Sequence, residues 1–240
     1  MPEEYLQFAY HPNKFWAATL AGRVRQSPNT TLKQRIAGWE GSKLREMCLA
    51  IATKLAMLDQ VVLRIDRQLG RLGDQIGDER KIEDCIRDGA AYAIADKNLP
   101  FEMLVDVDSF LFESRSAYEI VGKFLRELSK QFLGRSLSEK QLEAALANRC
   151  IDTRWIAQLR KDRTLFFHET APWVAARIIR TRPTKFELIV LKCDVQTFIN
   201  SNEWIDFERF REIYRGFLSA LESIHKWVVE QMEEFEKKST

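Results

Sequence analysis

The segment from residue 159 to residue 172 reads LRKDRTLFFHETAP, and it combines an apolar helical stripe with residues that carry chemistry. With Ile156 set at 0° on a helical wheel of about 100° per residue, the apolar residues Trp155, Leu159, Phe166 and Phe167 fall within roughly 100° of one another. Arg163 falls in the same arc. A guanidinium stays charged, and an unpaired charge in a protein core is very costly. Arg163 is therefore expected to need an acidic partner, a helix end or an anionic ligand.

His168, one of three histidines in the chain, lies about 140° from Arg163 on the same wheel. If the helix continued, the ring of Pro172 would clash with the carbonyl group of residue 168. The helix is therefore predicted to end near His168, where the chain can turn and bring the imidazole toward the guanidinium. The candidate acidic partners of Arg163 in the preceding long helix are Asp106, Asp108, Glu113 and Glu119.

An arginine, four intervening residues and a histidine, late in a series of long helices, resemble the signature of the HEPN superfamily (higher eukaryotes and prokaryotes nucleotide-binding). In this chain the match is Arg163 to His168, and helix order extends it over residues 100 to 235. The resemblance implies a helical bundle with metal-independent endoribonuclease activity and no cofactor, as in many toxins. The residue after the arginine is commonly a polar one such as asparagine, and here it is Thr164.

The resemblance also implies roles for individual residues. His168 would act as the general acid or base, because imidazole titrates near neutral pH. Arg163 would bind the phosphoryl oxygens and stabilise the added negative charge. The residues predicted to position the RNA strand are Arg160, Lys161 and Thr164. The residues predicted to support the site are Ser114, which interrupts an apolar stripe, and Glu169.

The composition is that of a globular protein with long helices. Of the 240 residues, 45% are apolar and 30% are charged, and there are only 10 glycines and 6 prolines. No run of about 18 apolar residues is present, so we expect no transmembrane helix and a cytoplasmic location. The four cysteines have no paired metal-ligand spacing and are expected to be reduced thiols in or near the core. They are Cys48, Cys85, Cys150 and Cys193.

Charge is unevenly distributed along the chain. The net charge is +2, but residues 149 to 185 contain nine basic and three acidic residues, a local balance of 9 − 3 = +6. A basic patch around the Arg163 motif predicts a phosphate-rich ligand, here RNA. The alternative interpretation is a solvated surface on which basic residues cluster by chance.

Apolar residues recur every three or four positions through most of the chain, which predicts a mainly α, up-and-down bundle of about four to six helices with a small β-hairpin insertion. The predicted helices cover residues 42–69, 79–97, 102–133, 138–148 and 153–168, with a final helix from residue 206; the hairpin covers residues 173–192. Gly70, Gly73 and Gly77 are expected to end the first helix. Residues 1–100 are expected to form an N-terminal arm and helical region that packs on a HEPN-like domain at 101–240.

Local cap signals support several of these helix starts. Ser138 followed by Gln141 fits a capping box. Asp152 or Thr153 is placed to cap the helix that leads to His168, and Asp206 is placed to start the final helix.

Two other functions remain open at this point. The bundle could bind RNA without cutting it, or act as the noncatalytic partner of a nucleotidyltransferase. If the chain is a toxin, an antitoxin is a candidate partner. In a purely structural interpretation, Arg163 is a salt-bridged arginine and His168 a histidine at a helix end.

For a ribonuclease, one arginine and one histidine are few groups, because the reaction needs an acid, a base and charge stabilisation. Two-fold pairing of identical chains doubles every group in a shared cleft. We therefore expect a homodimer in which the two motifs face each other, and the HEPN resemblance implies the same arrangement.

Overall fold

The computed structural model describes residues 16–35, 43–76, 96–133, 136–168, 172–179, 185–192 and 203–238. Several predictions lie outside these residues: the helix at 79–97, the break at Gly77, the turn at 181–184, and the positions of Glu169, Cys85 and Cys193. Within the described residues, the mainly α fold with a small β-hairpin is confirmed. None of the described helices combines the length and the apolarity needed to cross a membrane.

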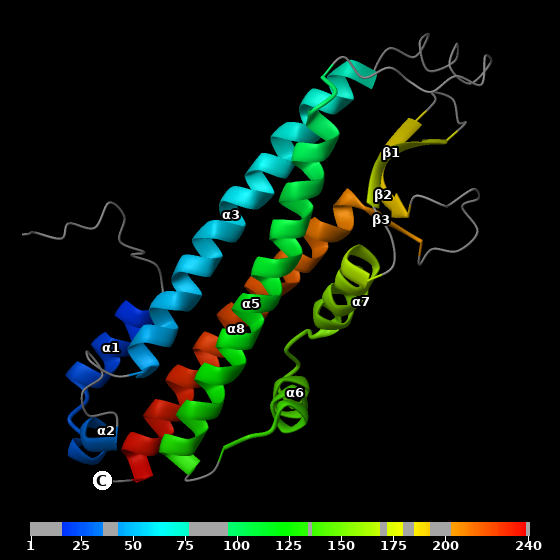
Figure 1. Cartoon of the computed structure of the whole chain (residues 1–240). Helices are drawn as coiled ribbons and strands as arrows, with labels where there is room; N and C mark the ends of the chain where they lie inside the picture. The colour runs from blue at the N-terminus through cyan, green and yellow to red at the C-terminus, as the bar shows by residue number, and fades with distance from the viewer. Residues whose placement is uncertain are drawn as a thin grey trace, which may run out of the picture. The chain divides into compact units, whose positions relative to one another are not determined.

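Three long helices dominate the fold: α3 (Lys43–Ile76), α5 (Leu99–Leu133) and α8 (Phe207–Lys238) (Figure 1). Each of them contributes one part to each of two compact units. The first unit comprises residues 1–56, 116–151 and 221–240, and the second comprises residues 57–115 and 152–220. The predicted boundary between residues 1–100 and 101–240 stays a prediction.

The second unit contains α7 (Arg154–His168) and an antiparallel sheet of β1 (Pro172–Ile179), β2 (Lys185–Lys192) and β3 (Trp204–Asp206). The strand order is β1-β2-β3, with Ala175 opposite Ile189 and Val190 opposite Ile205. The predicted hairpin at residues 173–192 is therefore confirmed. The sequence analysis did not predict β3, which adds a short third strand.

The first unit contains α1 (Trp16–Gln26), α2 (Thr30–Arg35) and α6 (Glu139–Asn148). The predicted capping box of α6 is confirmed, because the Ser138 hydroxyl accepts from the backbone N–H of Gln141 and the Gln141 side chain accepts from the N–H of Ser138. The expectation that all cysteines lie in or near the core is wrong for Cys150. That residue is exposed and has a positive φ of 57° just after α6, whereas Cys48 is buried.

The predicted end of the first long helix near residue 70 is wrong. Helix α3 continues through Gly70 and Gly73 to Ile76. Each glycine costs a helix about 1 kcal/mol relative to alanine. Burial of Leu72, which is 1% exposed, and of Ile76 offsets that cost, because these residues extend the apolar face of the helix by another turn.

In the second unit, aromatic residues connect α5, α7 and α8. Phe110 and Phe210 make an edge-to-face contact with ring centroids 5.6 Å apart, and Trp155 packs on Phe217 at 4.9 Å. Trp155 also lies directly against the backbone of Gly216. A Cβ atom built on Gly216 would lie 2.9 Å from Cβ of Trp155 and 3.0 Å from its Cδ1. Glycine at this position therefore allows α7 to approach α8 closely.

We predict opposite effects for two glycine-to-alanine substitutions in the long helices. Gly70→Ala should raise the free energy of unfolding by about 1 kcal/mol, because alanine favours the helix and the added Cβ meets open space. Gly216→Ala should lower it by about 1–3 kcal/mol, because Trp155 must shift within a packed core. Urea unfolding of both variants measures the difference. Equal stabilisation by both substitutions would contradict the close approach.

Candidate functional site

Helix α7 carries most of the candidate residues, and side-chain hydrogen bonds of neighbouring residues stabilise its first turn. A carboxylate oxygen of Asp152 accepts from the backbone N–H of Arg154 at 2.9 Å, which confirms the predicted cap. The same carboxylate pairs with the Arg154 guanidinium at 2.8 Å. These hydrogen bonds lower the pKa of Asp152 to about 2. The Trp155 indole N–H donates to the Asp152 carbonyl at 3.0 Å, so the cap and the aromatic packing occupy the same turn.

The buried face of α7 differs from the expected one in one respect. Trp155, Ile156 and Leu159 are buried, as the wheel predicted. Asp162 lies on that buried face and is only 1% exposed. Arg163, in contrast, is half-buried. The apolar arc lies closer to position 162 than the wheel suggested, so a carboxylate occupies the core position.

Asp162 is held by two side chains that the sequence analysis did not connect with it. One of its oxygens, Oδ1, accepts from Gln158 Nε2 at 2.7 Å and from Arg209 Nη1 at 3.3 Å. The same Nη1 atom donates to the carbonyl of Trp204 at 3.3 Å. Arg209 lies in the first turn of α8 and its side chain is 17% exposed. The pair therefore joins α7 to the junction of β3 and α8.

Burial has a larger effect on Asp162 than its partners have. Removal from water raises the pKa of the carboxyl to about 6, although Arg209 and Gln158 favour the charged form. The other oxygen, Oδ2, is buried and has no hydrogen-bond partner among the described residues. The sequence contained a signal for the burial of Asp162. Trp155, Leu159 and Asp162 are spaced by four and then three residues, which places them on one face of a helix.

The predicted RNA-positioning residues lie on the opposite face of α7. Arg160, Lys161 and Thr164 are exposed, and the Thr164 hydroxyl donates to the Arg160 carbonyl at 3.0 Å. Arg163 lies between this face and the buried one; its Nε atom is buried and its side chain interacts with at least one other residue. The helix ends at His168, as predicted. The His168 side chain and Glu169 lie outside the described part of the chain.

Ser114 and Asp106 of α5 are among the residues predicted to support the site or to pair with Arg163. Ser114 is buried at 1% exposure and lies in the second unit, as does α7. Asp106, a candidate partner of Arg163, instead binds Arg64 at 2.7 Å and Gln68 at 2.9 Å. The sequence analysis missed this network between α3 and α5.

The basic patch is partly neutralised by acidic side chains. Arg154 pairs with Asp152, Arg149 with Glu230 at 3.2 Å, and Arg177 with Glu187 at 3.6 Å. Two of these three carboxylates lie outside residues 149–185, so the local balance of +6 overstates the positive charge. In the part of the chain that the structure describes, no group of three or more histidine, cysteine or acidic side chains is placed to hold a metal ion.

No family model matches the chain, and neither a curated protein nor a solved structure matches it. The resemblance to the HEPN superfamily, and the site residues that it implies, therefore stay predictions.

We predict that the contribution of Asp162 to stability falls with rising pH. The unfolded chain loses this proton near the ordinary pKa of 3.8, whereas the folded protein keeps it until about pH 6. Between these values the folded state holds the Asp162 proton more tightly, so the contribution of this residue to the free energy of unfolding decreases as pH rises and levels off above about 6. The contribution of this one group is roughly 2–3 kcal/mol. Urea titrations between pH 4 and 7 measure it.

Two variants isolate this effect. Asp162→Asn keeps the shape of the side chain but removes its proton, so the part of the slope between pH 4 and 6 that Asp162 contributes should disappear. Asp152→Asn is the matched control on the same helix: with a folded pKa of about 2 and an ordinary value of 3.8, Asp152 contributes a slope of opposite sign that is confined to the low-pH end of this window. Identical slopes in wild type and Asp162→Asn would show that Asp162 does not titrate as described.

Proposed function

We propose that this protein is a metal-independent endoribonuclease of HEPN type that acts in the cytoplasm through α7. The observation that carries the proposal is the arrangement of α7 itself. Exposed Arg160 and Lys161 lie on its outer face, half-buried Arg163 lies beside them, and the helix ends at His168. Cationic side chains next to a fixed guanidinium suit an RNA backbone, whose phosphates dominate binding affinity.

One copy of α7 would supply part of the chemistry, and the same helix of a second chain would supply the rest. The ribose 2′-oxygen forms a bond to the adjacent phosphorus while the bond to the 5′-oxygen breaks. One proton leaves the 2′-hydroxyl and one is added to the departing 5′-oxygen; His168 would transfer one of them. Arg163 would donate hydrogen bonds to the phosphoryl oxygens as their negative charge grows.

Asp162 would support this reaction indirectly. At 1% exposure its carboxyl cannot touch RNA, but its bond to Arg209 fixes the helical turn that carries Arg160 and Arg163. A half-buried arginine is also restricted in its motion, so less entropy is lost when it binds a phosphate. The proposed site is thus organised before its substrate arrives.

A second candidate function is RNA binding without cleavage, including a role as the noncatalytic partner of a nucleotidyltransferase. One contact favours it. The Thr164 hydroxyl donates to a carbonyl of its own helix, so its proton is already used within the protein. The exposed cations of α7 would serve binding and cleavage equally well.

We predict cleavage of a single-stranded RNA containing all four bases in the presence of EDTA, with 2′,3′-cyclic phosphate and 5′-hydroxyl ends. Arg163→Ala and His168→Ala should each slow it by roughly 10²- to 10⁴-fold, because each removes a group that acts in the transition state. Product ends and rates are read by gel electrophoresis and mass spectrometry. A strand with 2′-O-methyl groups should resist cleavage.

Arg154→Ala is the control for loss of one positive charge on the same helix. The Arg154 side chain is 91% exposed and pairs with Asp152 at the other end of α7, so this variant should cut RNA at nearly the wild-type rate. If RNA binds but stays intact, and Arg160→Ala and Lys161→Ala weaken that binding, the noncatalytic function is the correct one. Cleavage that neither Arg163→Ala nor His168→Ala slows would refute the site.

We also predict that the active form is a homodimer with a shared cleft. Mixing Arg163→Ala chains with His168→Ala chains, followed by subunit exchange, should restore cleavage above the level of either variant alone, since a mixed dimer holds one intact residue of each kind. Gel filtration with light scattering gives the oligomeric state. A wild-type monomer that cuts RNA at a rate linear in protein concentration would exclude the shared site.

A further inference from the structure

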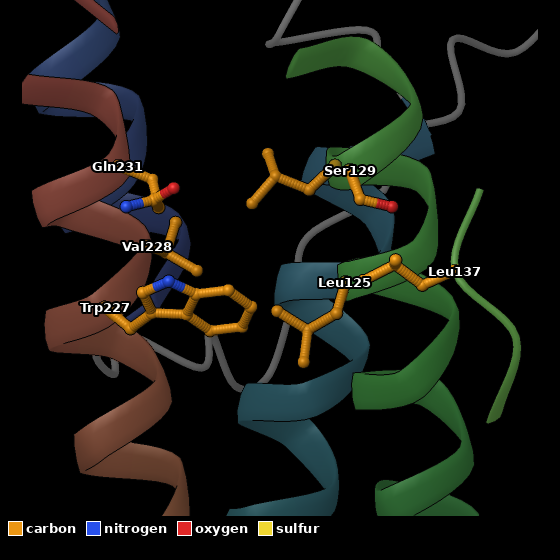
Figure 2. A pocket seen from close by; sticks show the side chains of 7 residues that line it. Leu125, Ser129, Leu137, Trp227, Val228 and Gln231 are labelled. Atoms are coloured by element: carbon orange, nitrogen blue, oxygen red, sulfur yellow. The ribbon is translucent and has the colours of Figure 1, made fainter. Parts of the chain in front are cut away.

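Apolar features outside the proposed RNA site occur in both units. The first unit has a small pocket between the C-terminal parts of α5 and α8 (Figure 2). Its lining residues are uncharged: Leu125, Leu128, Ser129, Leu137, Trp227, Val228 and Gln231. The second unit has the outer edge of its sheet, formed by β1 (Figure 1). The pocket wall does not specify a ligand, whereas the backbone of an edge strand has directed donors and acceptors that do specify a partner.

The register of the sheet shows which backbone groups lie on the outer edge of β1. The Lys192 N–H donates to the Glu203 carbonyl at 3.2 Å, so the backbone groups of Lys192 face β3. Hydrogen-bonding direction alternates along an antiparallel strand, and even-numbered residues of β2 lie opposite even-numbered residues of β1. Even-numbered residues of β1 therefore point their N–H and carbonyl groups away from β2. The outward N–H groups belong to Val174, Ala176 and Ile178, since Pro172 has none.

This outer edge has little protection against pairing. Among the described residues, no strand lies beside it. Natural sheets shield their edges with short strands, bulges, internal prolines or charges. The opposite edge strand, β3, is short, with three residues, whereas β1 has eight. The pairing of β1 with β2 contains no bulge, and its sequence PWVAARII has its proline at the first position and one charged residue, Arg177.

Burial falls across the sheet toward β1. Ile189 and Val190 point to opposite faces of β2, and both are 0% exposed. Ala175 and Val174, which lie opposite them in β1, are half-buried, and Trp173 is 60% exposed. The fold therefore covers both faces of the sheet at β2 and leaves β1 partly open on both faces. A further strand beside β1 would extend the covered region.

The outward groups of β1 are complementary to a second copy of the same strand. With two β1 strands antiparallel and Ala175 on the two-fold axis, Val174 lies opposite the partner's Ala176, and these two residues exchange both of their backbone hydrogen bonds. Ile178 lies opposite the partner's Pro172 and donates to its carbonyl. Proline has no N–H that would need an acceptor in return. Every outward N–H of each strand then has a carbonyl partner.

The same register suits the side chains on the face that carries Trp173. Ala175 meets its own copy at the axis, where a small side chain allows close approach. Trp173 lies opposite the partner's Arg177. Within one chain, the Arg177 guanidinium already lies on this face, 5.9 Å from the centroid of the Trp204 ring and 3.6 Å from the Glu187 carboxylate. A cation beside the exposed indole adds a favourable cross-strand contact.

We propose that the protein self-associates through β1, which pairs with β1 of a second copy in an antiparallel register centred on Ala175. The two three-stranded sheets then form one sheet of six strands. This interface is separate from the shared cleft predicted for α7 and does not depend on ribonuclease activity. Two different two-fold interfaces in one chain can close into a tetramer, in which β1 pairing joins two shared-cleft dimers. Without the shared cleft, β1 pairing joins two single chains.

Disulfide cross-linking of the full-length protein tests the register, in a Cys150→Ser background that removes an exposed native thiol. Ala175→Cys places two thiols opposite each other at a non-hydrogen-bonded pair, where Cα atoms about 4.5 Å apart suit a disulfide. Mild oxidation should give a covalent dimer, with the bridge between the two residues 175 identified by peptide mass spectrometry. Trp173→Cys is the matched control on the same face. Its two copies would lie roughly 14 Å apart along the strands and should not bridge.

Ala176→Pro tests the hydrogen bonds. Its N–H points outward, so proline removes bonds to the partner strand and keeps the ladder to β2. Light scattering should give half the wild-type mass, with an unchanged circular dichroism spectrum. If Ala176→Pro does not fold, Ala175→Glu serves the same purpose, because two carboxylates would meet on the axis. A monomeric wild type, a mass that the folded variant does not change, or equal cross-linking at residues 173 and 175 would each overturn the proposal.

Discussion

The buried ion pair between Asp162 and Arg209 is a polar constraint inside the core of the second unit. Removing a carboxylate from water is expensive, and a single cationic partner 3.3 Å away does not fully compensate for the loss of hydration. The raised pKa of Asp162 reflects that imbalance. Pairs of this kind specify an arrangement more than they stabilise it, because an incorrect register would leave both charges unpaired. Here the arrangement specified is that of α7 relative to α8 and to the last strand.

Apolar packing around this pair supplies most of the stabilisation. Trp155 packs on Phe217 and against the backbone of Gly216, about two helical turns from Arg209. Aromatic side chains bury large areas, and the absence of a side chain at residue 216 lets the indole approach the α8 backbone. The ion pair and the aromatic contact thus join the same two helices. The ion pair depends on the direction of its hydrogen bonds, whereas the aromatic contact depends on the apolar area that it buries.

The sequence predicted what depends on near neighbours. The long apolar stripes located α3, α5 and α8, and the caps at Ser138 and Asp152 were readable because each involves residues within three positions of one another. Strand β3 has three residues, too few for periodicity to detect. The persistence of α3 through Gly70 depends on tertiary burial that propensity does not measure.

The candidate site was predictable to a smaller extent. The wheel identified the apolar face of α7. It assigned the core position to Arg163 and overlooked Asp162, because the partner of Asp162 lies 47 residues further along the chain. Pairings at such separation follow from the fold alone.

The junction of β3 and α8 has a mechanical consequence. Asp206 ends the strand and accepts from the backbone N–H of Arg209 at 2.8 Å, so the sheet passes into the helix with no linker between them. Three residues after Asp206, Arg209 reaches Asp162 on α7. A hinge needs residues whose backbone torsions can change freely, and this junction offers none. A displacement of β3 should therefore be transmitted directly to the first turn of α8.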